Sequence, residues 1–303
     1  MTKDIDPFNV GYRDPETYDD MLPPHFYAGK EDIRLVADWI EDHFDGRRIP
    51  RALDIGCGNG RSTEVFASRV DTLVGADKSD GMIAAFAQRF PDARAVACDT
   101  ENLPALLRSQ SEAPFDLVTA FWSLSYPILE CFEELDATGV HVVSDESAGR
   151  RRVTAFLDGI IDSIADGGYF FGQFFDAESA EQRVVTELWE TIAPFPGTGR
   201  GFSWDLLRQH LLTKEREGEG RFTTTRLPGA VLIDSLDKAR RWFEVGHLNS
   251  YAPLVSAPST TARINEFLEG FVRADGSVLL PSGMHMFSFE KSGISGALPR
   301  PLQ

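Results

Sequence analysis

The first half of the chain alternates short apolar runs with amphipathic stretches. Apolar residues recur every three or four positions in residues 30–44, 62–69, 79–90 and 153–164, which is the spacing of one buried helical face. The apolar runs between them predict buried strands at residues 51–56, 72–77, 93–98, 115–121 and 169–175. Strands and helices that alternate in this way predict an α/β fold: a mostly parallel sheet with helices on both faces.

The pattern changes after Phe175. Helical spacing continues in residues 180–192, 204–212, 236–248 and 260–272, and strands are predicted at residues 221–234 and 277–290. Pro228-Gly229 interrupts the first of these strands, and Pro281-Ser282-Gly283 breaks the second. Two late strands separated by helices predict a β-pair that closes the sheet, seven strands in all, with an inserted helical cap.

A glycine-rich loop, Asp54-Ile55-Gly56-Cys57-Gly58-Asn59-Gly60, lies between the strand predicted at residues 51–56 and the helix predicted at residues 62–69. Glycine permits positive φ and lets a ligand approach the backbone closely. The dinucleotide fingerprint needs its third glycine where Arg61 stands, and no Gly-Lys-Ser/Thr follows as in a phosphate-binding loop. In open parallel sheets, ligands bind beyond the carboxyl ends of the strands, where the strand order reverses.

The acid followed by G-x-G-x-G resembles the first motif of the class I S-adenosylmethionine-dependent methyltransferases. Segments 74–82, 98–104, 115–121 and 164–169 resemble the later motifs in the family's order. The resemblance implies a Rossmann-like enzyme with S-adenosyl-L-methionine as its cofactor. Carried over position by position, it implies a cofactor-binding set of Asp54, Gly56, Gly58, Gly60, Asp77, Lys78, Met82, Asp99, Thr100 and Phe121.

The resemblance also implies a role for several of these side chains. Asp54 lies near the methionine ammonium of the cofactor, and Asp77, 21 residues after Gly56, accepts hydrogen bonds from the ribose hydroxyls. Met82 packs on the adenine edge, and Asp99 accepts from the adenine amino group.

Residues 275–281 and 286–289 resemble the closing strand of small-molecule enzymes related to trans-aconitate methyltransferase. We expect one methyltransferase domain over residues 1–303. Residues 1–29 would be an irregular arm or short-helix lid, 30–176 the cofactor-binding core, 177–275 the half with the cap, and 276–303 the closing strand and tail.

The sequence defines the residues that would contact the methyl acceptor less well than those that would bind the cofactor. Family members often carry Asn where this chain has Phe121 and His near Ser125, so the usual base is missing. His25 and Tyr27 are the catalytic candidates, and a structural role for both stays open. Aromatic and histidine side chains near the arm, the fourth strand and the cap are candidates for contact with the acceptor: Tyr18, Phe26, Tyr27, Trp122, Tyr126, His247 and Tyr251.

The predicted reaction is in-line methyl transfer to oxygen, nitrogen or carbon of a small molecule. We favour a carboxylate or an aromatic or apolar metabolite of a specialised pathway. A non-catalytic methyltransferase-like scaffold and a nicotinamide-dependent oxidoreductase are the alternatives. The acceptor and the oligomeric state stay open.

Net charge and composition limit the classes of molecule that we expect this protein to bind. The chain has 30 Lys and Arg against 47 Asp and Glu, a formal net charge of −17, which disfavours nucleic acids and anionic membranes. It lacks a long apolar run and a secretion signal, so we expect a cytoplasmic protein. Cys57, Cys98 and Cys131 are read as reduced thiols, and no histidine pair has metal-ligand spacing, so no metal is expected.

Overall fold

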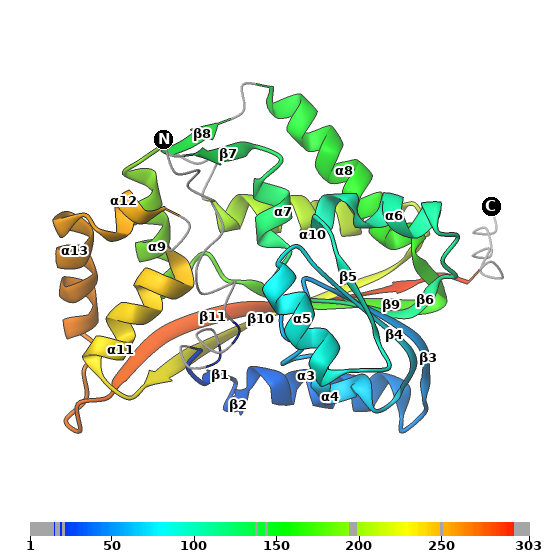
Figure 1. The fold of residues 1–303 in the computed structure, drawn as a ribbon, viewed down its shortest axis with the longest axis horizontal. Coiled ribbons are helices and arrows are strands. Elements are labelled where there is room, and N and C mark those ends of the chain that lie inside the picture. The colour runs from blue at the N-terminus through cyan, green and yellow to red at the C-terminus, as the bar shows by residue number, and fades with distance from the viewer. Residues whose placement is uncertain are drawn as a thin grey trace, which may run out of the picture.

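A single large sheet organises the computed structural model, which describes residues 15, 19, 22–136, 139–142, 145–193, 199–248 and 251–293 (Figure 1). Five of its strands are parallel and form the centre, and their order is β9-β6-β3-β4-β5. Their bounds are β3 Ile49–Ile55, β4 Val70–Asp77, β5 Arg94–Ala97, β6 Phe115–Phe121 and β9 Ile164–Phe175. The parallel sheet predicted from the apolar runs is confirmed.

Two long antiparallel strands extend the sheet beyond β9. Strand β11 (Val278–Lys291) pairs with β9, and β10 (Gly220–Ile233) pairs with β11 along its whole length. The breaks expected at Pro228-Gly229 and Pro281-Ser282-Gly283 are wrong. These residues face one another in register, Pro228 with Gly283 and Gly229 with Ser282, so both strands continue through them.

A short hairpin from the N-terminal segment adds two strands at the edge, so the main sheet has nine strands rather than seven. Strand β1 (His25–Tyr27) pairs with β10, and β2 (Lys30–Glu31) pairs with β1. Ala28 and Gly29 join them with φ of 50° and 79°, the positive values that a two-residue type I′ turn requires. The irregular arm expected through residue 29 is therefore corrected for residues 25–29.

Helices cover both faces of the sheet. Apolar residues of α3 (Asp32–Phe44), α4 (Glu64–Ala67) and α5 (Asp80–Arg89) pack in one core cluster. Those of α6 (Leu103–Ser109), α7 (Ser125–Leu129), α8 (Glu146–Asp162) and α10 (Arg200–Arg216) pack in another. The short 3₁₀ helix η1 (Thr100–Asn102) precedes α6, and a separate hairpin, β7 (Glu133–Asp136) and β8 (Gly139–Val142), follows α7.

A helical cap lies at one end of the long antiparallel strands (Figure 1). It consists of α9 (Ala180–Glu190), α11 (Leu236–Arg241), the π-helix η2 (Trp242–His247), α12 (Ala252–Val255) and α13 (Pro258–Glu269). Its apolar side chains form a third core cluster with Val231, Ile233, Val278 and Leu280 of β10 and β11. The expected helix over residues 236–248 is divided between α11 and η2.

Candidate functional site

The strand order reverses between β3 and β6, because the chain runs outward from β3 to β4 and β5 and then returns to β6 and β9. The glycine loop, residues 54–60, leaves the carboxyl end of β3 at this point. Open parallel sheets bind their ligands at such a reversal. The structure therefore places the loop where the fold expects a ligand.

The loop is held by the neighbouring strand, and its middle glycine is open. The amides of Gly56 and Cys57 donate to the Ala76 carbonyl oxygen at 2.7 and 3.0 Å. A Cβ on Gly56 would lie 2.3 Å from Ser123 Cβ, so this position accepts only glycine. Gly58 has φ of 55° and nothing within 4 Å of where a Cβ would stand. The backbone at Gly58 is thus bare toward open space, as close contact with a ligand requires.

Asp77 joins the end of β4 to the loop. One carboxylate oxygen accepts from the Gly58 amide at 3.0 Å, and the other accepts from the Ser79 amide at 2.9 Å. Burial raises the pKa of Asp77, and these amides partly offset the effect. Each carboxylate oxygen can accept a second hydrogen bond, so Asp77 retains capacity for two hydroxyl donors.

Asp54 lies beneath the loop and is 2% exposed. Its carboxyl oxygens accept from the hydroxyls of Thr63 and Thr119, at 2.5 and 2.8 Å. Burial raises the pKa of Asp54 to about 7, although both hydroxyls lower it. The side chain ties β3 to β6 and to the residues before α4, so the structure gives it a positioning role under the loop.

The raised pKa of Asp54 gives a testable pH dependence of stability. Between about pH 4 and pH 7 the folded state keeps a proton that the unfolded state has lost, so stability falls as the pH rises. At about 1.4 kcal/mol for each pKa unit, the loss approaches about 4 kcal/mol. We expect Asp54→Asn to remove this loss. Urea unfolding of both proteins from pH 4 to pH 8 checks it, and parallel profiles would contradict the assignment.

The other residues predicted to bind the cofactor differ in their exposure to solvent. Lys78 forms an ion pair with Glu130 at 2.5 Å, and Met82 is fully buried on α5. Asp99 is exposed after β5, and Thr100 opens η1 half-buried. The ring of Phe121 packs in the core, with centroids 6.5 Å from Phe66 and 5.6 Å from Phe171, so only its backbone is left to face a ligand.

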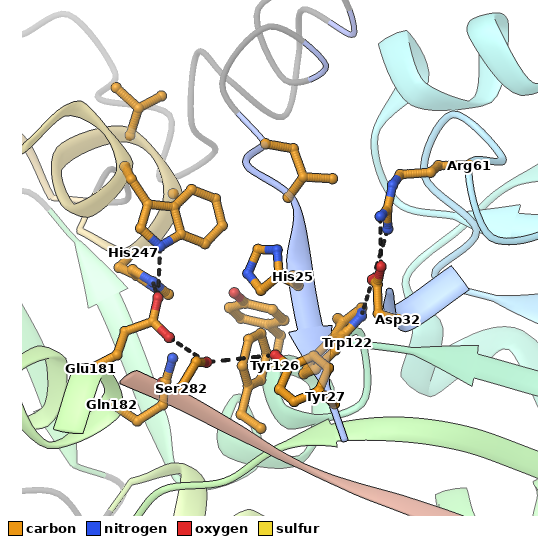
Figure 2. Close-up of a pocket in the computed structure, with 15 residues that line it drawn as sticks. His25, Tyr27, Asp32, Arg61, Trp122, Tyr126, Glu181, Gln182, His247 and Ser282 are labelled. Atoms are coloured by element: carbon orange, nitrogen blue, oxygen red, sulfur yellow. Dashed lines mark hydrogen bonds and ion pairs between the residues drawn. The ribbon is translucent and has the colours of Figure 1, made fainter. Parts of the chain in front are cut away.

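A cavity lies beside the loop, and Figure 2 shows its lining. It is bounded by β1, the ends of β6 and β9, and the cap helices α9 and η2. About 50 Å³ of it is open to a water-sized group. The residues that line it include His25, Tyr27, Asp32, Arg61, Trp122, Tyr126, Phe175, Glu181, Trp242, His247 and Ser282.

Five candidates for catalysis or acceptor contact meet in this cavity: His25, Tyr27, Trp122, Tyr126 and His247. Two others do not. Phe26 alternates with its neighbours along β1 and faces away from the cavity. Tyr251 packs against the third core cluster instead. Tyr18 lies outside the described residues, although Asp19 accepts a hydrogen bond of 2.6 Å from Asn59 of the loop.

Glu181 was not among the sequence candidates, yet it connects the cap to the cavity. Its carboxylate accepts from Trp242 Nε1 at 2.6 Å, His247 Nε2 at 2.9 Å and Ser282 Oγ at 2.7 Å (Figure 2). Burial alone raises the pKa of Glu181, but hydrogen bonding and charge from His247 outweigh it and bring the pKa to about 2. Glu181 is therefore ionised, and no Lys or Arg in the described ranges pairs with it.

A buried ion pair forms the opposite wall. Asp32 binds Arg61 through both carboxylate oxygens at 2.7 and 2.8 Å, and Trp122 Nε1 approaches Asp32 at 3.4 Å. The arginine that replaces the third glycine of the dinucleotide pattern thus links the glycine loop to α3. Trp122 itself has φ of 60°, which is strained for a tryptophan and fixes its ring at the cavity wall.

Cys57, Cys98 and Cys131 are free, and burial raises the pKa of each. Within the described ranges, no three His, Cys, Asp or Glu side chains converge as metal ligands do. None of the helices in those ranges combines the length and apolar character that crossing a bilayer requires.

The strand order, the glycine loop and the acidic strand ends together resemble those of the class I S-adenosylmethionine-dependent methyltransferases. Residues 52–137 match the family model described as a methyltransferase domain. This segment contains the loop and the ends of β3, β4, β5 and β6. Residues 52–137 thus match a methyltransferase domain, and the resemblance of the motifs in this segment to that family is confirmed.

Individual proteins resemble the chain more distantly. Trans-aconitate 2-methyltransferase of Variovorax paradoxus (strain S110) is 40% identical over 78 residues, 25% of this chain and 28% of that protein. The match thus spans about a quarter of each. The structure of YcgJ from Bacillus subtilis is 14% identical, with a TM-score of 0.51, covering 86% of this chain and 99% of that one. At this identity the likeness shows the fold alone.

Proposed function

We propose that this protein transfers a methyl group from S-adenosylmethionine to a small-molecule acceptor of a specialised pathway. The observation that carries the proposal is the juxtaposition of the glycine loop with the enclosed cavity. Arg61 follows the loop directly and Trp122 follows β6, and both line the cavity. A donor held at the loop would therefore stand beside an acceptor held in the cavity.

The loop residues fit such a donor. Gly58 offers bare backbone, Asp77 offers two carboxylate oxygens, and Asp99 is an exposed carboxylate after the next strand. Acidic side chains at these strand ends suit a nucleoside, whose ribose hydroxyls and amino group are donors. When bound, the cofactor supplies a methyl group on a sulfonium, the activated carbon that the acceptor attacks.

The cavity fits a small acceptor rather than a macromolecule. It is narrow, and aromatic rings supply much of its wall: Tyr27, Trp122, Tyr126, Phe175 and Trp242. Such walls bury apolar surface and exclude water, which favours transfer between the sulfonium and an electron-rich atom. The aromatic lining therefore suits an aromatic or apolar metabolite as the methyl acceptor. A carboxylate is the alternative acceptor.

Cofactor affinity tests the proposal. We expect Asp77→Ala to weaken binding of S-adenosylhomocysteine by more than tenfold, or 1.4 kcal/mol, because its oxygens accept the ribose hydroxyls. Asp71→Ala is the matched control, since Asp71 lies on the same strand but pairs with Arg48 at the exposed end. Isothermal titration calorimetry measures both.

Other outcomes favour other functions. Equal affinity in Asp77→Ala and the wild type would remove the ribose assignment. Binding of NAD in place of S-adenosylhomocysteine would favour an oxidoreductase. Binding of neither nucleotide would favour a non-catalytic scaffold.

A further inference from the structure

The imidazole of His25 is held in one tautomer at the cavity wall. Its Nδ1 lies 2.7 Å from the Pro23 carbonyl oxygen. A carbonyl oxygen only accepts, so the proton is on Nδ1 and the lone pair of the neutral ring is on Nε2. Within the described residues, Nε2 makes no hydrogen bond. This nitrogen is not fully buried either, so a ligand can reach it. His25 therefore presents a free basic nitrogen.

Charged groups on several elements surround this ring. Burial lowers the pKa of His25, Glu181 on α9 and Asp32 on α3 raise it, and Arg61 lowers it, so the pKa stays below its usual value. The ring is thus neutral at pH 7 and able to take a proton. Once protonated, it would be stabilised by the carboxylates of Glu181 and Asp32.

The remaining groups near the ring do not compete for this role. His247 donates from Nε2 to Glu181, and its Nδ1 is enclosed without a partner. Burial raises the pKa of Tyr27 far above its usual value, so the phenol stays neutral. Arg200 lies outside the cavity lining. Its guanidinium carbon is 4.0 Å from the Phe175 ring centre, and its nitrogens donate hydrogen bonds to Tyr126 and Gln182.

We propose that His25 is the general base of the methyl transfer, an inference that rests on the proposed function. The acceptor's lone pair forms the new bond to the methyl carbon, and the electron pair of the old carbon–sulfur bond stays on sulfur. The proton on the acceptor's oxygen or nitrogen passes to His25 Nε2. The imidazolium then returns that proton to solvent.

This assignment selects the acceptor class. A carboxylate is already ionised at pH 7 and needs no base. It would also meet the buried carboxylate of Glu181, which lines the same cavity. A base beside aromatic walls instead suits an acceptor whose reacting atom still carries a proton. The acceptor is therefore an aromatic phenol or amine, and not a carboxylate.

Methyl transfer to simple probes tests the assignment. Labelled S-adenosylmethionine is offered to the wild type with phenol, aniline or benzoate. We expect label on the phenol or the amine and none on benzoate. Label on benzoate alone, or on no probe, would overturn the acceptor class. Binding of S-adenosylhomocysteine, measured in parallel with the transfer assay, tests the proposed function separately.

Variants of His25 test the base itself. We expect His25→Ala and His25→Gln to lower kcat at neutral pH by about 100-fold or more, as loss of a general base does, with cofactor affinity unchanged. His43→Ala, on the far end of α3, is the matched control. At alkaline pH, where phenol ionises without the help of a base, the variants should approach the wild type. An equal loss at every pH would show a structural role and overturn the proposal.

Nitrogen NMR of the imidazole gives a readout that needs no acceptor. We expect the Nδ1–H tautomer in the wild type and a pKa for His25 that falls further in Glu181→Gln, because the carboxylate raises it. An Nε2–H tautomer would overturn the assignment, whether or not the protein binds the cofactor.

Discussion

Replacing Glu181 by alanine is expected to lower the free energy of unfolding by about 3–5 kcal/mol, as loss of one partner from a buried charged network does. The substitution leaves the Trp242 indole, the His247 ring and the Ser282 hydroxyl without their shared acceptor. These donors come from η2 and β11, so the loss would loosen the cap from the sheet. Urea denaturation at pH 7 measures the change.

Glu187→Ala is the matched control for this prediction. Glu187 lies on the same helix and pairs with Arg263, but its side chain is 53% exposed. Exposed ion pairs contribute about 0–1 kcal/mol, so the control should stay near the wild type. A similar, small loss in both variants would show that Glu181 does not hold the cap in place.

Adding a methyl group at Gly58 is expected to weaken binding of S-adenosylhomocysteine by about tenfold or more. The new Cβ would stand in the open space above the loop, where overpacking against a ligand costs about 1–3 kcal/mol. Calorimetry with Gly58→Ala measures the loss.

Gly276→Ala separates this steric effect from backbone strain. Gly276 also has positive φ, 84°, and open space around its Cβ position, but it lies in the turn before β11. Both variants strain the backbone, and only Gly58→Ala should lose affinity. Equal affinities in the two variants would contradict the placement of the cofactor over the loop.

The parallel core was predictable because its signals are local. The first two apolar runs end at Gly56 and Asp77, the third is followed by Asp99, and a helical stretch comes after each, so chain order fixes the alternation. The loop and the acids after the strands are close in sequence to the strands that position them. Asp54 and Asp77 could be found in this way, although only the structure shows that Asp54 is enclosed beneath the loop.

The edge hairpin and the acceptor cavity were not predictable in the same way. The turn of the hairpin uses Ala28-Gly29, a weaker signal than Asn-Gly. Glu181 stands in the first turn of an amphipathic helix, where an acid normally faces solvent and stabilises the helix dipole. Its three donors are 61, 66 and 101 residues away in the chain. Only tertiary packing brings them together.

In the proposed complex, one nucleoside lies over Gly58 with its ribose at Asp77. A crystal structure with S-adenosylhomocysteine tests it most directly. We expect density across the backbone of Gly58, both ribose hydroxyls within hydrogen-bond distance of Asp77, and the sulfur facing the cavity beside His25. A nucleoside bound elsewhere, or a loop closed against it in a well-folded protein, would contradict this placement of the cofactor.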